Sequence, residues 1–109
     1  MILDFPSMEE TVLEHFCGGE GALCARMYND GSNKILRGRL APGASIGAHT
    51  HDTSSETIYI LQGAGRVVYD GVSQPVAAGQ CHHCPKGHSH SLINDSGADL
   101  IFFAVVPQQ

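Results

Sequence analysis

Short apolar segments separated by turn-forming residues recur along most of the chain and predict an all-β domain. Side chains in a strand alternate between the two faces of a sheet, and the run "ETIYILQ" shows this alternation clearly. The intervening segments, such as "NDGSN", "APGA" and "YDGVS", are rich in residues that favour turns. The expected strands cover approximately residues 21–28, 34–40, 45–51, 56–63, 65–71, 73–79, 80–85, 90–95 and 99–107.

The first part of the chain has a less decisive pattern. Ser7 and Glu10 have the spacing of a capping box, and the apolar residues that follow could lie on one face of a short helix. The same residues could instead extend a strand, although we favour the helix. We therefore expect an N-terminal extension over about residues 1–20. Since no repeat or linker is visible, the sequence predicts a single domain over residues 1–109.

The segment "PGASIGAHTHDTSSETIYILQG" contains the first candidate metal ligands. His49 and His51 are two residues apart, so in a strand their imidazoles share a face. The polar "DTSS" is a natural loop that lets the chain return, so that Glu56 can face the same interior. Two imidazoles and a carboxylate suit first-row transition metals. For an isolated pair of this kind, solvated residues at a strand edge would be the favoured interpretation.

A second segment, "GQCHHCPKGHSHSLIN", supplies a further histidine, and together the two segments resemble the paired motifs of the cupin superfamily. The first motif, G-x5-H-x-H-x4-E-x6-G, spans 43–63 and is filled by Gly43, His49, His51, Glu56 and Gly63. The second, G-x5-P-x-G-x2-H-x3-N, spans 79–94 and is filled by Gly79, Pro85, Gly87, His90 and Asn94. The sequence departs from many cupins at Gln80, where Asp is common.

The resemblance implies a double-stranded β-helix, the jelly-roll barrel of cupins, and a metal held by His49, His51, Glu56 and His90. The metal would be a divalent transition ion, with Fe, Mn, Ni, Zn, Co and Cu all compatible with three imidazoles and one carboxylate. Four protein ligands leave two positions of an octahedron open for water, oxygen or a substrate.

The remaining histidines and cysteines are weaker candidates. In the run "CHHC", Cys81 and Cys84 should face opposite sides of a strand and cannot hold one metal together. His82 and Cys84 share a face and could line the pocket, with His82 as a catalytic candidate. His88 is either a solvated turn residue or a proton-transfer group at the pocket mouth.

Strand parity also suggests the apolar wall of the site. Ile58 and Ile60 share the parity of Glu56 and should line the pocket, whereas Tyr59 should face the opposite way, toward sheet packing or a subunit interface. We expect His15, Cys17 and Cys24, which lie outside both motifs, to be structural.

Charge and composition exclude several classes of partner. The chain has six Lys and Arg against eleven Asp and Glu, a formal net charge of −5, and no basic cluster, which argues against nucleic acid and anionic membranes. The N-terminus does not resemble a secretory signal, and no apolar run is long enough to span a bilayer. We therefore expect a cytoplasmic protein whose four cysteines are reduced thiols.

The resemblance implies a metal-dependent enzyme acting on a small metabolite, of the dioxygenase, decarboxylase or isomerase type. The alternative is a non-catalytic module that binds or senses a small ligand through the same metal, because one fold hosts many activities. The segment "DLIFFAVVP" has apolar residues on both faces, which predicts cover from a second subunit and hence a homodimer.

Overall fold

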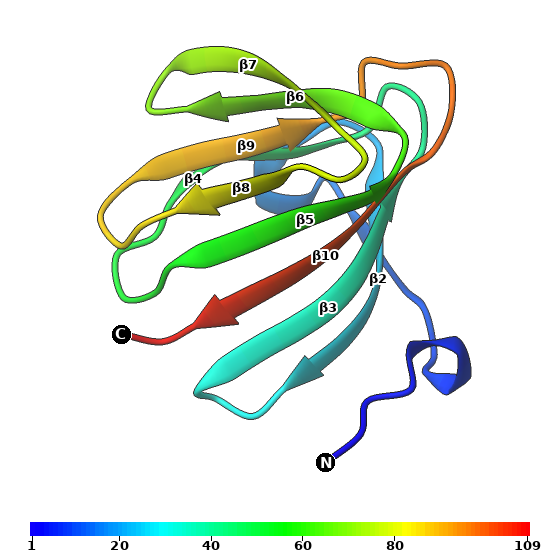
Figure 1. Cartoon of the computed structure of the whole chain (residues 1–109), viewed down its shortest axis with the longest axis vertical. Coiled ribbons are helices and arrows are strands. Elements are labelled where there is room, and N and C mark those ends of the chain that lie inside the picture. The colour runs from blue at the N-terminus through cyan, green and yellow to red at the C-terminus, as the bar shows by residue number, and fades with distance from the viewer.

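The computed structural model describes all residues, 1–109, and consists of two antiparallel sheets that face each other (Figure 1). The six-stranded sheet has the order β1-β2-β3-β10-β5-β8, and the four-stranded sheet has the order β4-β9-β6-β7. The elements are η1 (Phe5–Ser7), β1 (Thr11–Glu14), η2 (Phe16–Gly18), β2 (Ala22–Asn29), β3 (Asn33–Leu40), β4 (Ser45–Thr50), β5 (Glu56–Gln62), β6 (Ala64–Tyr69), β7 (Val72–Ala77), β8 (Cys81–Cys84), β9 (Ser89–Ile93) and β10 (Leu100–Pro107). This confirms the predicted all-β jelly roll.

The core lies between the two sheets and follows from the alternation of side chains along each strand. In β10, every second residue from Leu100 to Val106 is buried, and Phe102 is fully buried at the centre of the cluster. Complete burial of such a side chain stabilises the fold by about 1.5–3 kcal/mol. Gly38 pairs with Phe102 across the sheet, and the absence of a Cβ there leaves room for the aromatic ring.

The prediction of an N-terminal helix is wrong. Residues Thr11–Glu14 form β1, which pairs with β2 at the edge of the six-stranded sheet. The capping box does not form, since the Ser7 hydroxyl donates to the Asp4 carbonyl and Glu10 forms an ion pair with Arg39. Pairing with the free edge of β2 satisfies the backbone hydrogen bonds of this short segment, so tertiary context decides its conformation.

The short helix η2 packs directly on β4 because two glycines allow close approach. A Cβ built on Gly47 would overlap the carbonyl oxygen of Cys17, and one built on Gly19 would overlap the carbonyl oxygen of Ser45. The backbone of Glu20 makes two hydrogen bonds to Ser45, each of 2.9 Å. These contacts fix η2 over the opening between the sheets.

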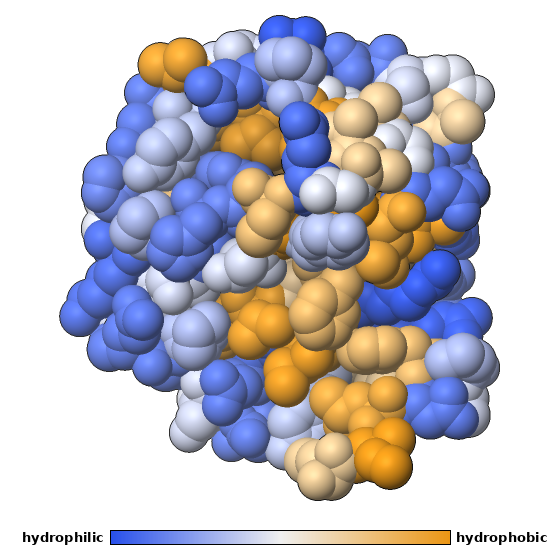
Figure 2. All heavy atoms as spheres, in the orientation of Figure 1, coloured by the Kyte–Doolittle hydropathy of each residue, from blue (hydrophilic) through white to orange (hydrophobic).

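The outer face of the six-stranded sheet is partly covered by the N-terminal segment. The ring of Phe5 meets that of Phe103 edge-on at 6.1 Å, and the guanidinium of Arg26 donates to the carbonyl of Phe5. Tyr59 and Leu61 remain exposed, and Figure 2 shows apolar side chains in a band that reaches the N-terminal segment at the lower edge. Tyr59 thus faces away from the core, as its parity predicted. The two helical segments, η1 and η2, have three residues each, and neither could span a bilayer.

Candidate metal centre

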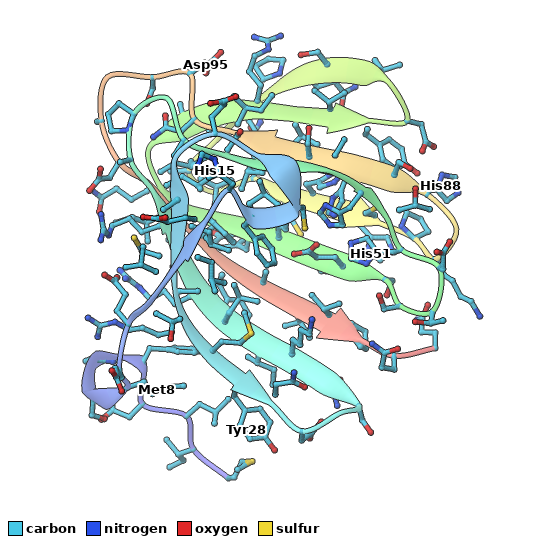
Figure 3. All side chains as sticks on the ribbon, turned by 180° about the vertical axis from the view of Figure 1, so that it is seen from behind. Met8, His15, Tyr28, His51, His88 and Asp95 are labelled. Atoms are coloured by element: carbon cyan, nitrogen blue, oxygen red, sulfur yellow. The ribbon has the colours of Figure 1, made fainter.

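Four predicted ligands come together between the sheets. His49 lies on β4 and pairs across the sheet with His90 on β9, while His51 directly follows β4. Glu56 begins β5 in the opposite sheet, after a short loop that is held to the C-terminal segment by hydrogen bonds. Their ligand atoms all lie within 4.8 Å of one another. Figure 3 shows His51 pointing inward, between the ribbons.

The distances within the cluster suit a bound cation. Glu56 Oε1 lies 2.9 Å from His90 Nε2, 3.1 Å from His51 Nε2 and 3.8 Å from His49 Nε2, and the Nε2 atoms of His51 and His90 are 2.9 Å apart. Ligand atoms about 2.1 Å from an ion and at right angles to each other are separated by roughly 3.0 Å. The cluster could therefore hold a metal in adjacent coordination positions.

The outer nitrogen of each imidazole has a hydrogen-bond partner. His49 Nδ1 donates to the Gly47 carbonyl at 2.8 Å, and His51 Nδ1 forms a hydrogen bond with the Ser54 hydroxyl at 2.9 Å. His90 Nδ1 forms a hydrogen bond with His82 Nε2, also at 2.9 Å. In the metal-free cluster the Nε2 atoms face the Glu56 carboxylate and donate hydrogen bonds to it, and a cation would bind to the Nε2 lone pairs in place of those protons. Hydrogen bonds at the outer nitrogen commonly orient metal-binding histidines, so the donor set fits a divalent transition metal.

The electrostatics of the cluster are consistent with this assignment. Burial alone would raise the pKa of Glu56, but hydrogen bonds from His49, His51 and His90 outweigh it and hold the pKa well below its usual range. In return, the hydrogen bond to Glu56 raises the pKa of His49. The carboxylate is therefore ionised at neutral pH, and it and the three imidazoles surround the position where a cation would bind.

A cavity of about 170 Å³ opens beside this cluster, and His49, His51 and Glu56 line one part of it. Its apolar wall includes Phe16, Leu23, Met27, Leu36, Ile46, Phe102 and Val106. Its other polar residues are Cys17, Lys34, Ser54 and Gln108. Lys34 is the cationic residue among them, and its charge acts to lower the pKa of His49. The cavity is thus small and largely apolar, and the candidate metal ligands lie along one side of it.

The predicted pocket residues Ile58, Ile60 and Cys84 lie elsewhere. The two isoleucines are buried on the face predicted from parity, but they pack in the core and do not line this cavity. Cys84 pairs with Glu56 across the sheet and is also fully buried, and burial raises its thiol pKa to about 11. Cys81 is exposed, so the two cysteines do face opposite sides of β8.

The two histidines considered for catalysis also lie outside the cavity. His82 contacts the outer edge of His90, and burial lowers its pKa to about 4. It lines a second cavity, of about 350 Å³, together with residues of β6 and β7. His88 stacks on Tyr69 and pairs with Asp70 at the surface. Both histidines are therefore separated from the chamber that would admit a ligand.

Cys17 and Lys34 line the cavity, although the sequence predicts neither as a pocket residue. Cys17 was expected to be structural, and its position depends on the docking of η2, which no local pattern reveals. Partial burial and the charge of Glu56 raise its pKa. Lys34 did carry a signal, because it shares its strand face with the buried Leu36 and Leu40, and a charged residue on an apolar face indicates a special environment.

Comparisons with known proteins agree with this architecture. An oxalate-binding protein from Thermotoga maritima is 40% identical over 72 residues, which is 66% of this chain and 60% of that relative, so the match leaves a substantial part of the relative uncovered. A crystal structure described as a predicted oxalate decarboxylase from Thermotoga maritima superposes with a TM-score of 0.94 at 28% identity, covering 100% of both chains.

A sugar phosphate isomerase from Silicibacter pomeroyi shares the fold, with a TM-score of 0.83 at 22% identity, covering 100% of this chain and 76% of that one. The sequence also matches the family of the cupin domain over residues 36–106. The family match contains both motifs and all four clustered ligands, and the chain belongs to the cupin family.

Proposed function

We propose that this cupin holds a divalent transition metal through His49, His51, Glu56 and His90 and uses it to bind a small dicarboxylate of the oxalate type. The observation that carries the proposal is the junction between the four-ligand cluster and the small cavity that contains Lys34. The names of the Thermotoga maritima relatives support the same class of ligand.

Charge favours an anionic ligand at this position. A divalent ion, the Glu56 carboxylate and the Lys34 ammonium together carry a net charge of +2 within a chain of net charge −5. A dicarboxylate dianion would neutralise that local charge, and its two carboxylate oxygens could occupy the open coordination positions. Attraction inside a partly buried chamber is stronger than at the surface.

Size favours a short ligand. Pockets for drug-sized molecules are usually about 300–1,000 Å³, whereas this chamber is about 170 Å³. Its apolar wall offers few hydrogen-bonding groups beyond Ser54, Gln108 and Cys17. A sugar phosphate, with many hydroxyl groups, would find few partners there. We therefore favour a compact acid over the isomerase-type substrates that other members of the fold use.

A metal-dependent decarboxylase is the second candidate, and the position of Cys17 is the observation that favours it. Decarboxylation breaks a carbon–carbon bond, releases carbon dioxide and needs a proton for the carbon that remains. Cys17 lines the cavity. Its raised pKa keeps the thiol protonated at neutral pH, so the thiol could donate that proton. When bound, the metal would act as a Lewis acid on the substrate carboxylate. His82 and His88 could not serve this role directly, as neither lines the cavity.

The test begins with protein purified without a histidine tag. Its metal content is measured, and the metal-free protein is titrated with Mn(II), Co(II) and Zn(II), followed by calorimetric titration of the loaded protein with oxalate. We expect one ion per chain and oxalate binding that requires the ion. If Glu56→Gln kept both metal binding and oxalate binding, the ligand assignment would be refuted. Formate or carbon dioxide release from oxalate would identify the decarboxylase instead of the binding protein.

Lys34→Met tests the anion-binding role, since methionine keeps an apolar stem without the charge. It should weaken oxalate binding about tenfold and leave metal affinity nearly unchanged. Lys86→Met is the matched control, because Lys86 is exposed and does not line the cavity. Equal oxalate affinity in the two variants would remove Lys34 from the proposal.

We also propose that the protein is a cytoplasmic homodimer that associates through the exposed outer face of the six-stranded sheet, where Val12, Tyr59 and Leu61 lie. Sedimentation velocity at micromolar concentration should give a dimer. A monomer in that experiment would refute the proposed association.

A further inference from the structure

We propose that His82 is a positioning residue of the metal centre, and that its Nε2 atom accepts the hydrogen bond that fixes the tautomer and orientation of His90. This inference rests on the proposed function, because it assigns His82 to the metal that His90 would bind. It replaces a catalytic role for His82 with a role exerted through a neighbouring ligand.

The contact is well defined and lies on the outer side of His90. His90 Nδ1 and His82 Nε2 are 2.9 Å apart, and the ring centroids are separated by 5.1 Å. On the inner side, His90 Nε2 faces Glu56 Oε1 at 2.9 Å. His90 is only 3% exposed, so water has little access to its ring. Its outer nitrogen therefore depends on a protein acceptor, and His82 supplies it.

The orientation of His82 is itself constrained. The edge of Tyr69 approaches the ring of His82 at 5.6 Å between centroids, while His90 lies at its Nε2 atom. To accept a hydrogen bond at Nε2, His82 must carry its own proton on Nδ1. The same ring lines the cavity beside β7. The tautomer of His82 on β8 therefore determines which ring nitrogen of His90 on β9 carries a proton.

The three candidate imidazole ligands differ in how their outer nitrogens are held. The acceptor for His49 is a backbone carbonyl of its own strand, and the acceptor for His51 is a hydroxyl three residues away. The acceptor for His90 is a side chain on β8, in the other sheet. The orientation of His90 can therefore be altered by substituting His82, which replaces none of the four candidate ligands.

Loss of the acceptor would permit the opposite tautomer of His90. In that tautomer, Nε2 carries the proton and points it at the position of the metal, so binding would first require a change of tautomer. Removal of comparable acceptors from other metal sites weakens metal binding by about 10–100-fold. The same change would loosen the ring and alter the coordination geometry.

The first experiment compares His82→Phe, His82→Gln and His83→Phe with the wild-type protein. Phenylalanine fills the space without an acceptor, whereas the glutamine Oε1 can reach the position of Nε2. His83 is the matched control, since it is adjacent on β8 but exposed on the opposite face. Chelator competition measures Co(II) affinity, and visible absorption of the Co(II) protein reports coordination geometry.

We expect His82→Phe to bind Co(II) at least tenfold more weakly and with an altered spectrum. His82→Gln should recover affinity to within about threefold of wild type, and His83→Phe should match wild type. Wild-type affinity and spectrum in His82→Phe would overturn the proposal. So would equal losses in the Phe and Gln variants at position 82, because a purely structural role would not distinguish them.

A second measurement separates this inference from the proposed metal function. Nitrogen-15 NMR of the metal-free protein reports which ring nitrogen of His90 is protonated. We expect a proton on His90 Nδ1 in the wild type and its loss from Nδ1 in His82→Phe, since Glu56 accepts from Nε2 in both metal-free proteins. An unchanged His90 tautomer would refute the positioning role even if the protein bound no metal. A wild-type protein that bound no metal but showed this tautomer shift would refute only the proposed function.

Discussion

Replacing Asn94 with alanine should destabilise the barrel by about 3 kcal/mol. Asn94 ends the second motif, follows β9 and is fully buried. Its Nδ2 donates to the carbonyls of Leu40 and Ala98, each at 2.8 Å, and its Oδ1 accepts from the backbone and hydroxyl of Ser96. The side chain thereby joins the end of β3 to the loop before β10.

The magnitude follows from what the truncation exposes. Each hydrogen bond contributes about 1 kcal/mol net, but the Ser96 groups lie near the surface and can regain water. The Leu40 carbonyl is buried and would lose the Asn94 Nδ2 donor, which water cannot easily replace, at a cost of about 1–3 kcal/mol. A total of about 3 kcal/mol corresponds to a fall in Tm of roughly 15 °C for a domain of this size.

The assay is urea unfolding of the metal-free protein at pH 7, because a bound ion would add its own stabilisation. Asp95→Ala is the control, since Asp95 is exposed and should change stability by less than about 0.5 kcal/mol. Asn94→Asp should be worse than alanine, as it replaces both donors with a buried charge. A loss below about 1 kcal/mol in Asn94→Ala, with an unchanged m value, would refute the reasoning.

Three further predictions test other parts of the structure. Gly47→Ala should displace η2, destabilise the protein by about 2 kcal/mol and speed modification of Cys17 by a thiol reagent, whereas Gly97→Ala, with open space around it, should do neither. Backbone amides of the following turn lower the pKa of Asp30, so the stabilisation by this carboxylate is present above about pH 4 and is lost as pH falls through the folded pKa. In urea titrations, Asp30→Asn should therefore be less stable than wild type at pH 7, and the two free energies of unfolding should become equal in acid. A divalent ion at 100 times its Kd should stabilise wild type by about 2.7 kcal/mol in thermal melts but give little stabilisation to Glu56→Gln.

The strands could be predicted because each carries its own alternation and is bounded by turn residues. The segment expected over 99–107 is β10 from Leu100 to Pro107, and the segment expected over 34–40 is β3 from Asn33 to Leu40. β1 was misassigned because four residues support either a helix turn or a strand, and only the free edge of β2 decides between them.

The site was predictable to the extent that motifs and parity define it. The motif spacing identified the four residues that cluster, whereas parity predicted only which face Ile58 and Ile60 occupy. Parity does not say whether an inward side chain borders a cavity or packs in the core. Those two residues pack in the core because the cavity instead adjoins η2, β2 and β3, which lie outside the motifs.

Gly47 links the cover of the cavity to the candidate metal ligands. Its carbonyl accepts the His49 Nδ1 proton at 2.8 Å, while its missing side chain allows the Cys17 carbonyl to approach. Any shift of η2 must therefore displace the residue that orients His49, in addition to moving Cys17 at the cavity. A ligand that enters beneath η2 could therefore reach the metal position directly and also shift His49 through Gly47. His82 orients His90 from the far side and does not line the cavity beside η2. His49 and His90, which pair across β4 and β9, are therefore oriented by different parts of the fold.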